Sequence, residues 1–320
     1  MLAKKVWLGA SAAALVLAAC GQRVETKNGE TAPAAAEVTV NEGEPVDGEV
    51  TLSVPATAMA GTEIALAFTG PANARDYIDI VPRGYEQTSG ELAYIYVPAA
   101  VAGGMLRVVT APGEYDVRYV LDLNGARSVK AAQPLTVTAA EATLDAPASA
   151  SGGETLSVAW TGPAGQGDYI DLVRKGHGAT SGEITYAYAA SGNPASLNAP
   201  GAAGDYELRY ILEGPGGRRV LASSPLAVAL PEAQLTAPEA ASPGERVIVE
   251  YEGPMRSGDY VDLVRRGYIA TSGEMAYFYA DGRSANELVM PDEAGEYDIR
   301  YVMEAPGGRA VLAKQTIRVE

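Results

Sequence analysis

The chain has 320 residues, of which 40 are acidic and 24 are basic, so its formal net charge is −16. No run of basic residues is longer than two. Because a nucleic-acid-binding surface needs a basic face, nucleic acid is excluded as a partner. A single cysteine and a single histidine exclude a disulfide framework and any site that needs several histidines.

Residues 1–19 have the features of a secretory signal peptide: a lysine pair, an apolar run and small residues before a cysteine. The apolar run is too short for a transmembrane helix, which needs about 20 apolar residues. The stretch 17–21, Leu-Ala-Ala-Cys-Gly, resembles the lipobox of bacterial lipoproteins. The resemblance implies that Cys20 is acylated and becomes the mature N-terminus. Gly21 stands where an aspartate would favour the inner membrane, so we expect an extracytoplasmic lipoprotein of the cell envelope, anchored in the outer membrane.

Residues 20–49 are the expected lipidated N-terminus and tether. The segment is rich in Ala, Pro, Glu, Thr and Val and shows no sustained hydrophobic period. It cannot bury enough apolar surface to offset the entropy lost on ordering, so we expect it to be disordered. Two acyl chains at its end would give stable membrane anchoring, which one chain would not.

The rest of the chain repeats one unit three times. The landmark tyrosines of an Asp-Tyr-x-Asp motif, Tyr77, Tyr169 and Tyr260, lie 92 and 91 residues apart. A unit of about ninety residues is too long for a solenoid repeat and suits an independent small domain. We place the three domains at residues 50–138, 142–229 and 233–320.

Within each unit, apolar and polar residues alternate with period two, and Gly, Pro, Asn or Ser interrupts them every eight to twelve residues. Such alternation predicts half-buried strands, as at Leu156, Val158 and Trp160. No stretch shows convincing helical periodicity. Seven or so short strands with regular turns predict an all-β fold of three tandem immunoglobulin-like antiparallel β-sandwiches.

A second motif supports the sandwich. Tyr115, Tyr206 and Tyr297 each follow a glycine and an acidic residue and precede an apolar strand. This arrangement resembles the tyrosine corner of immunoglobulin-like domains, where the hydroxyl bonds back to the backbone. Because the chain has no cysteine pair, the domains would lack the disulfide of antibody domains.

An aspartate and an arginine recur in strands that are neighbours in an immunoglobulin-like sandwich. Residues three apart in a strand point to opposite faces, so the two aspartates of the motif can share a calcium ion only if the first lies in the preceding turn. We predict structural cross-strand pairs, with calcium binding or a solvated surface as alternatives, and assign no metal site. The pairs are Asp79 with Arg118, Asp171 with Arg209, and Asp262 with Arg300.

The loop after the Asp-Tyr-x-Asp strand carries a basic residue, a glycine and a flat ring, followed by Thr-Ser-Gly-Glu. Loops on a rigid scaffold commonly bind ligands, although a hairpin that only satisfies turn geometry would look the same. His177 fills a slot that tyrosine fills in the other units, which argues against a metal ligand or a catalytic base. The candidate binding residues are Arg83, Tyr85, Lys175, His177, Arg266 and Tyr268.

A Tyr-x-Tyr row in each unit places two rings on one face of a strand. Such rings either cover the edge of the core or face solvent, where they can stack on sugars. The rows are Tyr94 with Tyr96, Tyr186 with Tyr188, and Tyr277 with Tyr279.

No catalytic residue and no cofactor is assigned. The sequence has no Gly-x-Ser-x-Gly motif and no phosphate-binding glycine loop with lysine. The acidic residues recur in all three units, whereas catalysis needs one assembled cleft. Repetition favours a scaffold or a multivalent binder, so we expect a protein that is not an enzyme.

Several motifs occur together: an aromatic-x-Gly-Pro turn, Asp-Tyr-Ile-Asp-Leu-Val, Gly-Asp-Tyr-Glu-Leu-Arg-Tyr-Ile and Arg-Val-Leu-Ala-Ser-Ser-Pro-Leu. The combination resembles the β-sandwich repeats that follow von Willebrand A domains in some secreted bacterial proteins. It is more distantly similar to SKICH-type immunoglobulin-like modules. The resemblance implies a fold and an extracytoplasmic setting, and it carries no catalytic residues. This chain departs from it in having no von Willebrand A domain and no Asp-x-Ser-x-Ser motif.

We therefore expect a non-catalytic envelope lipoprotein that projects three β-sandwich domains from the membrane and binds or scaffolds an envelope protein. The alternative is a multivalent surface protein that binds a glycan or a divalent cation such as calcium.

Overall fold

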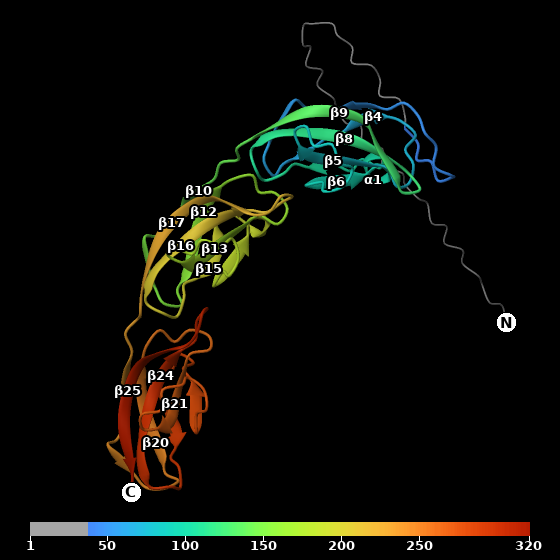
Figure 1. Cartoon of the computed structure of the whole chain (residues 1–320). Helices are drawn as coiled ribbons and strands as arrows, with labels where there is room; N and C mark the ends of the chain where they lie inside the picture. Colours follow the sequence, from blue (N-terminus) through green and yellow to red (C-terminus); the bar gives the residue numbers. More distant parts are fainter. Residues whose placement is uncertain (1–37) are drawn as a thin grey trace, which may run out of the picture. The chain divides into compact units, whose positions relative to one another are not determined.

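The structure is a computed structural model that describes residues 38–320. Cys20, the predicted signal peptide and most of the predicted tether lie outside the described residues. The described end of the tether is not disordered as predicted: Val38 packs against the core of the first repeat, and the Asn41 amide donates to the Ala72 carbonyl at 2.9 Å. Nearly all of the regular secondary structure in the described chain is strand, as the sequence predicts, and each repeat forms its own group of sheets (Figure 1). Two short helical turns interrupt it, α1 (Val97–Val101) and the 3-10 turn η1 (Ala189–Ser191). Within residues 38–320, no helix combines the length and the apolar character needed to cross a bilayer.

The second repeat shows the plan. One sheet has the strand order β11-β17-β16-β13-β14 and the other has the order β10-β12-β15. Neighbouring strands are antiparallel, except that β11 runs parallel to β17. The strands are β10 (Thr143–Asp145), β11 (Ser149–Ser151), β12 (Thr155–Thr161), β13 (Tyr169–Arg174), β14 (Thr185–Tyr188), β15 (Ala195–Asn198), β16 (Gly204–Leu212) and β17 (Arg219–Ala229).

The other repeats follow the same order. In the third repeat the sheets are β19-β25-β24-β21-β22 and β18-β20-β23. The strands are β18 (Gln234–Thr236), β19 (Ala240–Ala241), β20 (Arg246–Glu252), β21 (Tyr260–Arg265), β22 (Ala276–Tyr279), β23 (Ala285–Val289), β24 (Gly295–Met303) and β25 (Ala310–Val319). In the first repeat the five-stranded sheet is β2-β9-β8-β5-β6. Its strands are β2 (Thr57–Met59), β5 (Tyr77–Pro82), β6 (Ala93–Tyr96), β8 (Gly113–Leu123) and β9 (Ala126–Thr138).

The second layer of the first repeat is split where the sequence predicts one strand. The alternating residues from Ile64 to Phe68 fall into two pieces, β3 (Glu63–Ile64) and β4 (Ala67–Thr69). β3 pairs with the two-residue β7 (Leu106–Arg107), and β4 pairs with β1 (Thr51–Ser53). The corresponding β15 is four residues long and pairs along β12. The short β7 therefore leaves the middle of the predicted strand without a ladder partner.

The hydrophobic core of each repeat lies between its two sheets. In the second repeat Leu156 and Val158 of β12 cluster with Ile170 and Leu172 of β13, and all four side chains are buried. Period two sends Asp171 to the opposite face of β13, yet it is also buried. The central strand is therefore covered on both faces, and the cover over Asp171 leads to the candidate site.

Each repeat has the tyrosine corner that the sequence suggests. The hydroxyl of Tyr206 donates to the carbonyl oxygen of Ala202 at 2.8 Å. Tyr115 and Tyr297 make the same bond to the residue four positions upstream, at 3.0 and 2.8 Å. Together with the strand order, these corners define the domains as immunoglobulin-like.

Candidate functional site

A buried ion pair lies on the outer face of each five-stranded sheet. Asp171 and Arg209 face each other across β13 and β16, and their side chains are 0% and 3% exposed. Nε and Nη2 of Arg209 donate to the two Asp171 oxygens at 3.0 and 2.6 Å. The pairs Asp79–Arg118 and Asp262–Arg300 repeat this two-bond geometry.

The same arginine fastens the loop that follows the central strand. Nη1 of Arg209 donates to the carbonyl oxygens of His177 and Ala179 at 3.1 and 2.8 Å. Arg118 and Arg300 hold their loops in the same way. Burial raises the pKa of the Asp171 carboxyl, and the hydrogen bonds from Arg209 oppose that rise. Arg209 makes these four hydrogen bonds within the protein, so the buried pair has little hydrogen-bonding capacity left for a ligand.

The side chains of the predicted binding loops have partners within the protein. The rings of Tyr85 and Tyr268 lie over the guanidinium groups of Arg118 and Arg300, with 5.8 and 5.9 Å from ring centroid to Cζ. The His177 Nε2 lies 2.6 Å from a carbonyl of its own loop. The basic residues pair with acidic residues on the next strands: Arg83 with Glu114, Lys175 with Asp205, and Arg266 with Glu296. These contacts within the protein are enough to explain the conformation of the loops. Ligand binding at the loops therefore stays a prediction.

The first aspartate of the motif lies in the turn before β13. Asp168 is fully buried and accepts hydrogen bonds from the Gly165 amide, the Tyr210 hydroxyl and the Glu213 amide at 2.9 to 3.0 Å. Asp76 and Asp259 accept three matching bonds each. Both aspartates of the motif therefore already have protein partners. No group of three or more metal-ligating side chains occurs in the part of the chain that the structure describes.

A hollow of a different character lies on the same sheet face, at the β14 edge. The rings of Tyr169, Tyr186 and Tyr188 meet edge to face, with centroids 5.4 to 6.4 Å apart. The last two side chains are each 48% exposed, so they face solvent rather than the core. We call the hollow the tyrosine pocket; its volume is about 230 Å³ and its lining is Gly167, Tyr169, Glu183, Tyr186, Tyr188, Glu213 and Arg218.

The charges of the tyrosine pocket are only partly compensated. Arg218 lies over the Tyr169 ring at 5.6 Å and donates a hydrogen bond from Nε to Glu213. Oε2 of Glu183 is buried and has no hydrogen-bond partner. Burial raises the pKa of the Tyr169 hydroxyl although Arg218 opposes the rise, so this group stays protonated and donates to the Thr180 carbonyl. Arg218 thus hydrogen-bonds to Glu213 and acts on Glu183 through its charge alone.

The third repeat has the same pocket. Arg309 lies 5.5 Å from the Tyr260 ring centroid and donates to Glu304. Among the described residues, three buried side-chain atoms lack a partner: Oε2 of Glu183, Oε2 of Glu274 and the Tyr251 hydroxyl. The third-repeat pocket has a volume of about 150 Å³ and is lined by Gly258, Tyr260, Glu274, Tyr277, Tyr279, Glu304 and Arg309. The unpaired glutamate oxygen therefore recurs in the same setting.

The first repeat departs from this arrangement. Arg127 lies over the Tyr77 ring at 5.4 Å, as in the other repeats. Arg75 stands where the other pockets have glycine, and the shorter Asp122 replaces glutamate. Nε of Arg75 lies 3.9 Å from Asp122, which adds a cation at the rim. The residues at this position in the first repeat therefore carry one positive charge more than the pockets of the second and third repeats.

The backbone conformation of the turn explains why glycine stands at the rim of the tyrosine pocket in the second and third repeats. Gly167 and Gly258 have φ of +89° and +95°, a region that favours glycine. A Cβ on Gly167 would lie 3.0 Å from Cγ of Glu213. The absence of a side chain thus lets the glutamate that pairs with Arg218 pack against the turn.

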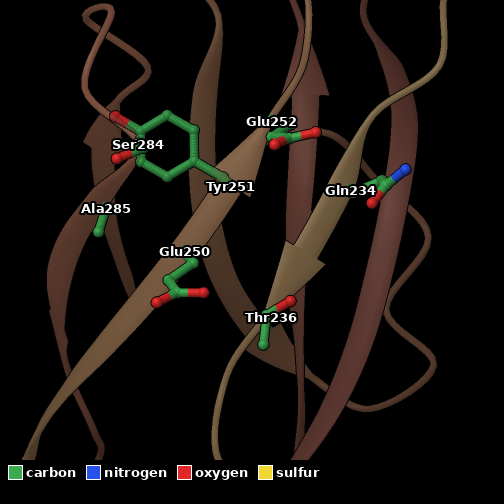
Figure 2. Close-up of a pocket in the computed structure, with 7 residues that line it drawn as sticks. All are labelled: Gln234, Thr236, Glu250, Tyr251, Glu252, Ser284 and Ala285. Carbon is green, nitrogen blue, oxygen red and sulfur yellow. The ribbon is translucent and has the colours of Figure 1, made fainter.

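Figure 2 shows a separate hollow of about 320 Å³ on the three-stranded sheet of the third repeat. Gln234, Thr236, Glu250 and Glu252 of β18 and β20 line it, together with Tyr251, Ser284 and Ala285. Phe68 and Trp160 occupy the Tyr251 position in the other repeats, so its hydroxyl belongs to the third repeat alone. The first and second repeats therefore have no hydroxyl at the position that corresponds to Tyr251.

Sequence reasoning identified the tyrosine rows but missed the charged half of the pocket. Glu91, Glu183 and Glu274 recur at the same spacing as the landmark tyrosines. Arg127, Arg218 and Arg309 also recur, 91 residues apart each time. The signal that would have found them is their recurrence once in each repeat, although only the fold shows that the turn, the loop and the edge strand meet.

No family model matches this chain, and no curated protein matches it. Among solved structures it is similar to Drosophila OTK extracellular domains 3-5, at 13% identity and a TM-score of 0.26, covering 88% of this chain and 99% of that one. It is also similar to the FN1-FN3 domains of chicken CNTN1, at 12% identity and a TM-score of 0.22, covering 84% and 97%. A marsupial T cell receptor matches at 12% identity and a TM-score of 0.25, covering 84% and 98%. Because these TM-scores are low, the assignment of the fold depends on the strand order and the tyrosine corners and not on these similarities.

Proposed function

We propose that this protein is a non-catalytic binding module of the cell envelope, anchored in the outer membrane by acyl chains on Cys20. The observation that carries the binding role is the tyrosine pocket, which recurs in two repeats with an unpaired glutamate oxygen among half-exposed rings. A buried polar atom without a partner costs free energy, so its recurrence favours use by a ligand over use in folding.

The lipobox motif and the extracytoplasmic character of the resembling repeats support the anchored setting. In this proposal the three domains extend from the membrane and engage an envelope protein partner, such as one with a von Willebrand A domain. Two pockets on one chain bind such a partner with avidity. The second candidate, glycan binding, is favoured by the half-exposed Tyr186–Tyr188 and Tyr277–Tyr279 rows.

The test is affinity capture of the tagged protein after cross-linking on intact cells, with wild type and Tyr186→Ala/Tyr277→Ala compared. We expect the double variant to lose the partners or glycans that wild type recovers, while both remain in the outer-membrane fraction. The matched control is Ile248→Ala/Val289→Ala, which removes two exposed apolar side chains outside the pockets and outside the candidate binding loops. Equal recovery by the tyrosine variant and wild type would contradict the proposal, and release of a Cys20→Ala variant from membranes tests the anchor.

A further inference from the structure

We infer that the tyrosine pockets of the second and third repeats bind primary ammonium groups, supplied by lysine side chains of a partner polypeptide. The inference rests on the proposed function, because it names the ligand of the same pockets.

The charge of each pocket favours a cation. In the second repeat Arg218 and Glu213 neutralise each other through their hydrogen bond, which leaves Glu183 as the net charge. The third repeat repeats this balance with Arg309, Glu304 and Glu274. The whole chain, at −16, attracts a basic partner over a longer range.

The unpaired oxygens need a donor. An ionised carboxylate only accepts hydrogen bonds, whereas an ammonium group carries three donors and no acceptor. A lysine head group in the pocket therefore supplies donors and a positive charge to the Glu183 or Glu274 carboxylate, which lines the pocket. Charge-assisted bonds of this kind are about twice as strong as neutral ones.

The rings suit the rest of the side chain. Tyr186 and Tyr188 are each 48% exposed, and Tyr277 and Tyr279 are 52% and 59% exposed. The face of a tyrosine ring attracts an ammonium group, and ring edges cover the apolar stem of lysine. The protein already uses this attraction inside the pocket, where Arg218 lies over Tyr169.

Size and composition favour a single side chain over a metal ion. Volumes of about 150 and 230 Å³ fall below the roughly 300–1,000 Å³ of pockets for drug-sized molecules and fit one side chain. Calcium takes about six to eight oxygen ligands. The pocket offers two carboxylates, Glu183 and Glu213, and Glu213 is already held by Arg218, so it supplies fewer free oxygens than calcium takes.

A polypeptide source is favoured by the position of the pockets. Tyr186 and Tyr188 belong to β14, and Tyr277 and Tyr279 belong to β22. Both strands end their sheets, so each pairs with one strand only in its sheet. An extended peptide can add along such an edge and present alternate side chains to pockets beside it.

The experiment titrates the full chain in detergent with the peptide acetyl-Gly-Lys-Gly-amide and follows the tyrosine ring resonances by NMR. We expect saturable shifts for wild type, and at least tenfold weaker binding when the lysine is Nε-acetylated. Glu183→Gln/Glu274→Gln should weaken binding to the same extent. The matched control Asp205→Asn/Glu287→Gln removes the same charge from exposed sites and should bind like wild type.

Absence of binding up to the solubility limit of the peptide would overturn the inference, as would equal binding by the glutamine variant or of the acetylated peptide. Binding of glucosamine in place of the lysine peptide would overturn the polypeptide source. The two proposals fail separately. If Tyr186→Ala/Tyr277→Ala abolishes capture from cells while lysine does not bind, only the ammonium ligand is wrong.

Discussion

Two arginine–carboxylate arrangements lie on the same face of each five-stranded sheet and differ in how completely their hydrogen bonds are made. Asp171 and Arg209 are almost fully buried, and the arginine makes four hydrogen bonds within the protein. Glu213 and Arg218 are 32% and 39% exposed, and Glu183 beside them keeps an unpaired oxygen. The same residue types therefore serve the fold where they are saturated and leave binding capacity where they are not.

Removing the buried cation should have the largest effect. Arg209→Met leaves Asp171 as an uncompensated buried charge and frees two loop carbonyls, so we expect the second repeat to lose about 3–5 kcal/mol of unfolding free energy. Trp160 fluorescence during urea unfolding follows this repeat, because the other tryptophan, Trp7, lies in the predicted signal peptide. Arg219→Met removes an exposed arginine and is the control. A loss below about 1 kcal/mol would show that the pair does not hold the loop.

The turn aspartate should come next. Asp168→Ala leaves two amides and the Tyr210 hydroxyl without their acceptor, and we expect a loss of about 2–4 kcal/mol. Asp205→Ala removes an exposed carboxylate and should change stability by less than about 0.5 kcal/mol. Equal effects of the two variants in the same urea experiment would contradict the structural role of Asp168.

The tyrosine corner should contribute less. Tyr206→Phe removes one hydrogen bond to the Ala202 carbonyl and keeps the ring, so we expect a loss of about 1 kcal/mol. Thermal unfolding measured alongside Tyr188→Phe, whose hydroxyl lies on the exposed face, checks this value. If both variants unfold together with wild type, the corner is dispensable.

These rankings also separate what sequence could predict from what it could not. The period-two pattern predicted the strands, and the strand neighbours of an immunoglobulin-like fold brought Asp171 opposite Arg209 as expected. The split between β3 and β4 follows from the short partner strand β7, and the parallel pairing of β11 with β17 joins segments far apart in the sequence. No local pattern encodes either feature. The pocket was missed for a related reason, because its residues come from a turn, a loop and an edge strand that only tertiary structure joins.

The pocket tyrosines should have the smallest effect on stability. Tyr186→Ala removes a half-exposed ring and its edge-to-face contacts, and we expect a loss below about 1 kcal/mol. Capture of a partner should nevertheless fall when Tyr277→Ala accompanies it. A large loss of unfolding free energy would instead assign the row to the core edge.

The measurement that tests the comparison most directly is the unfolding free energy of Glu183→Gln, read by Trp160 fluorescence, together with its binding of the lysine peptide. Because the substitution removes a partly buried carboxylate that has one unpaired oxygen, we predict stability equal to wild type or higher by up to about 1 kcal/mol, with binding to the second repeat lost. Destabilisation approaching that of Arg209→Met, or wild-type binding, would contradict the claim that this carboxylate is kept for a ligand and not for the fold.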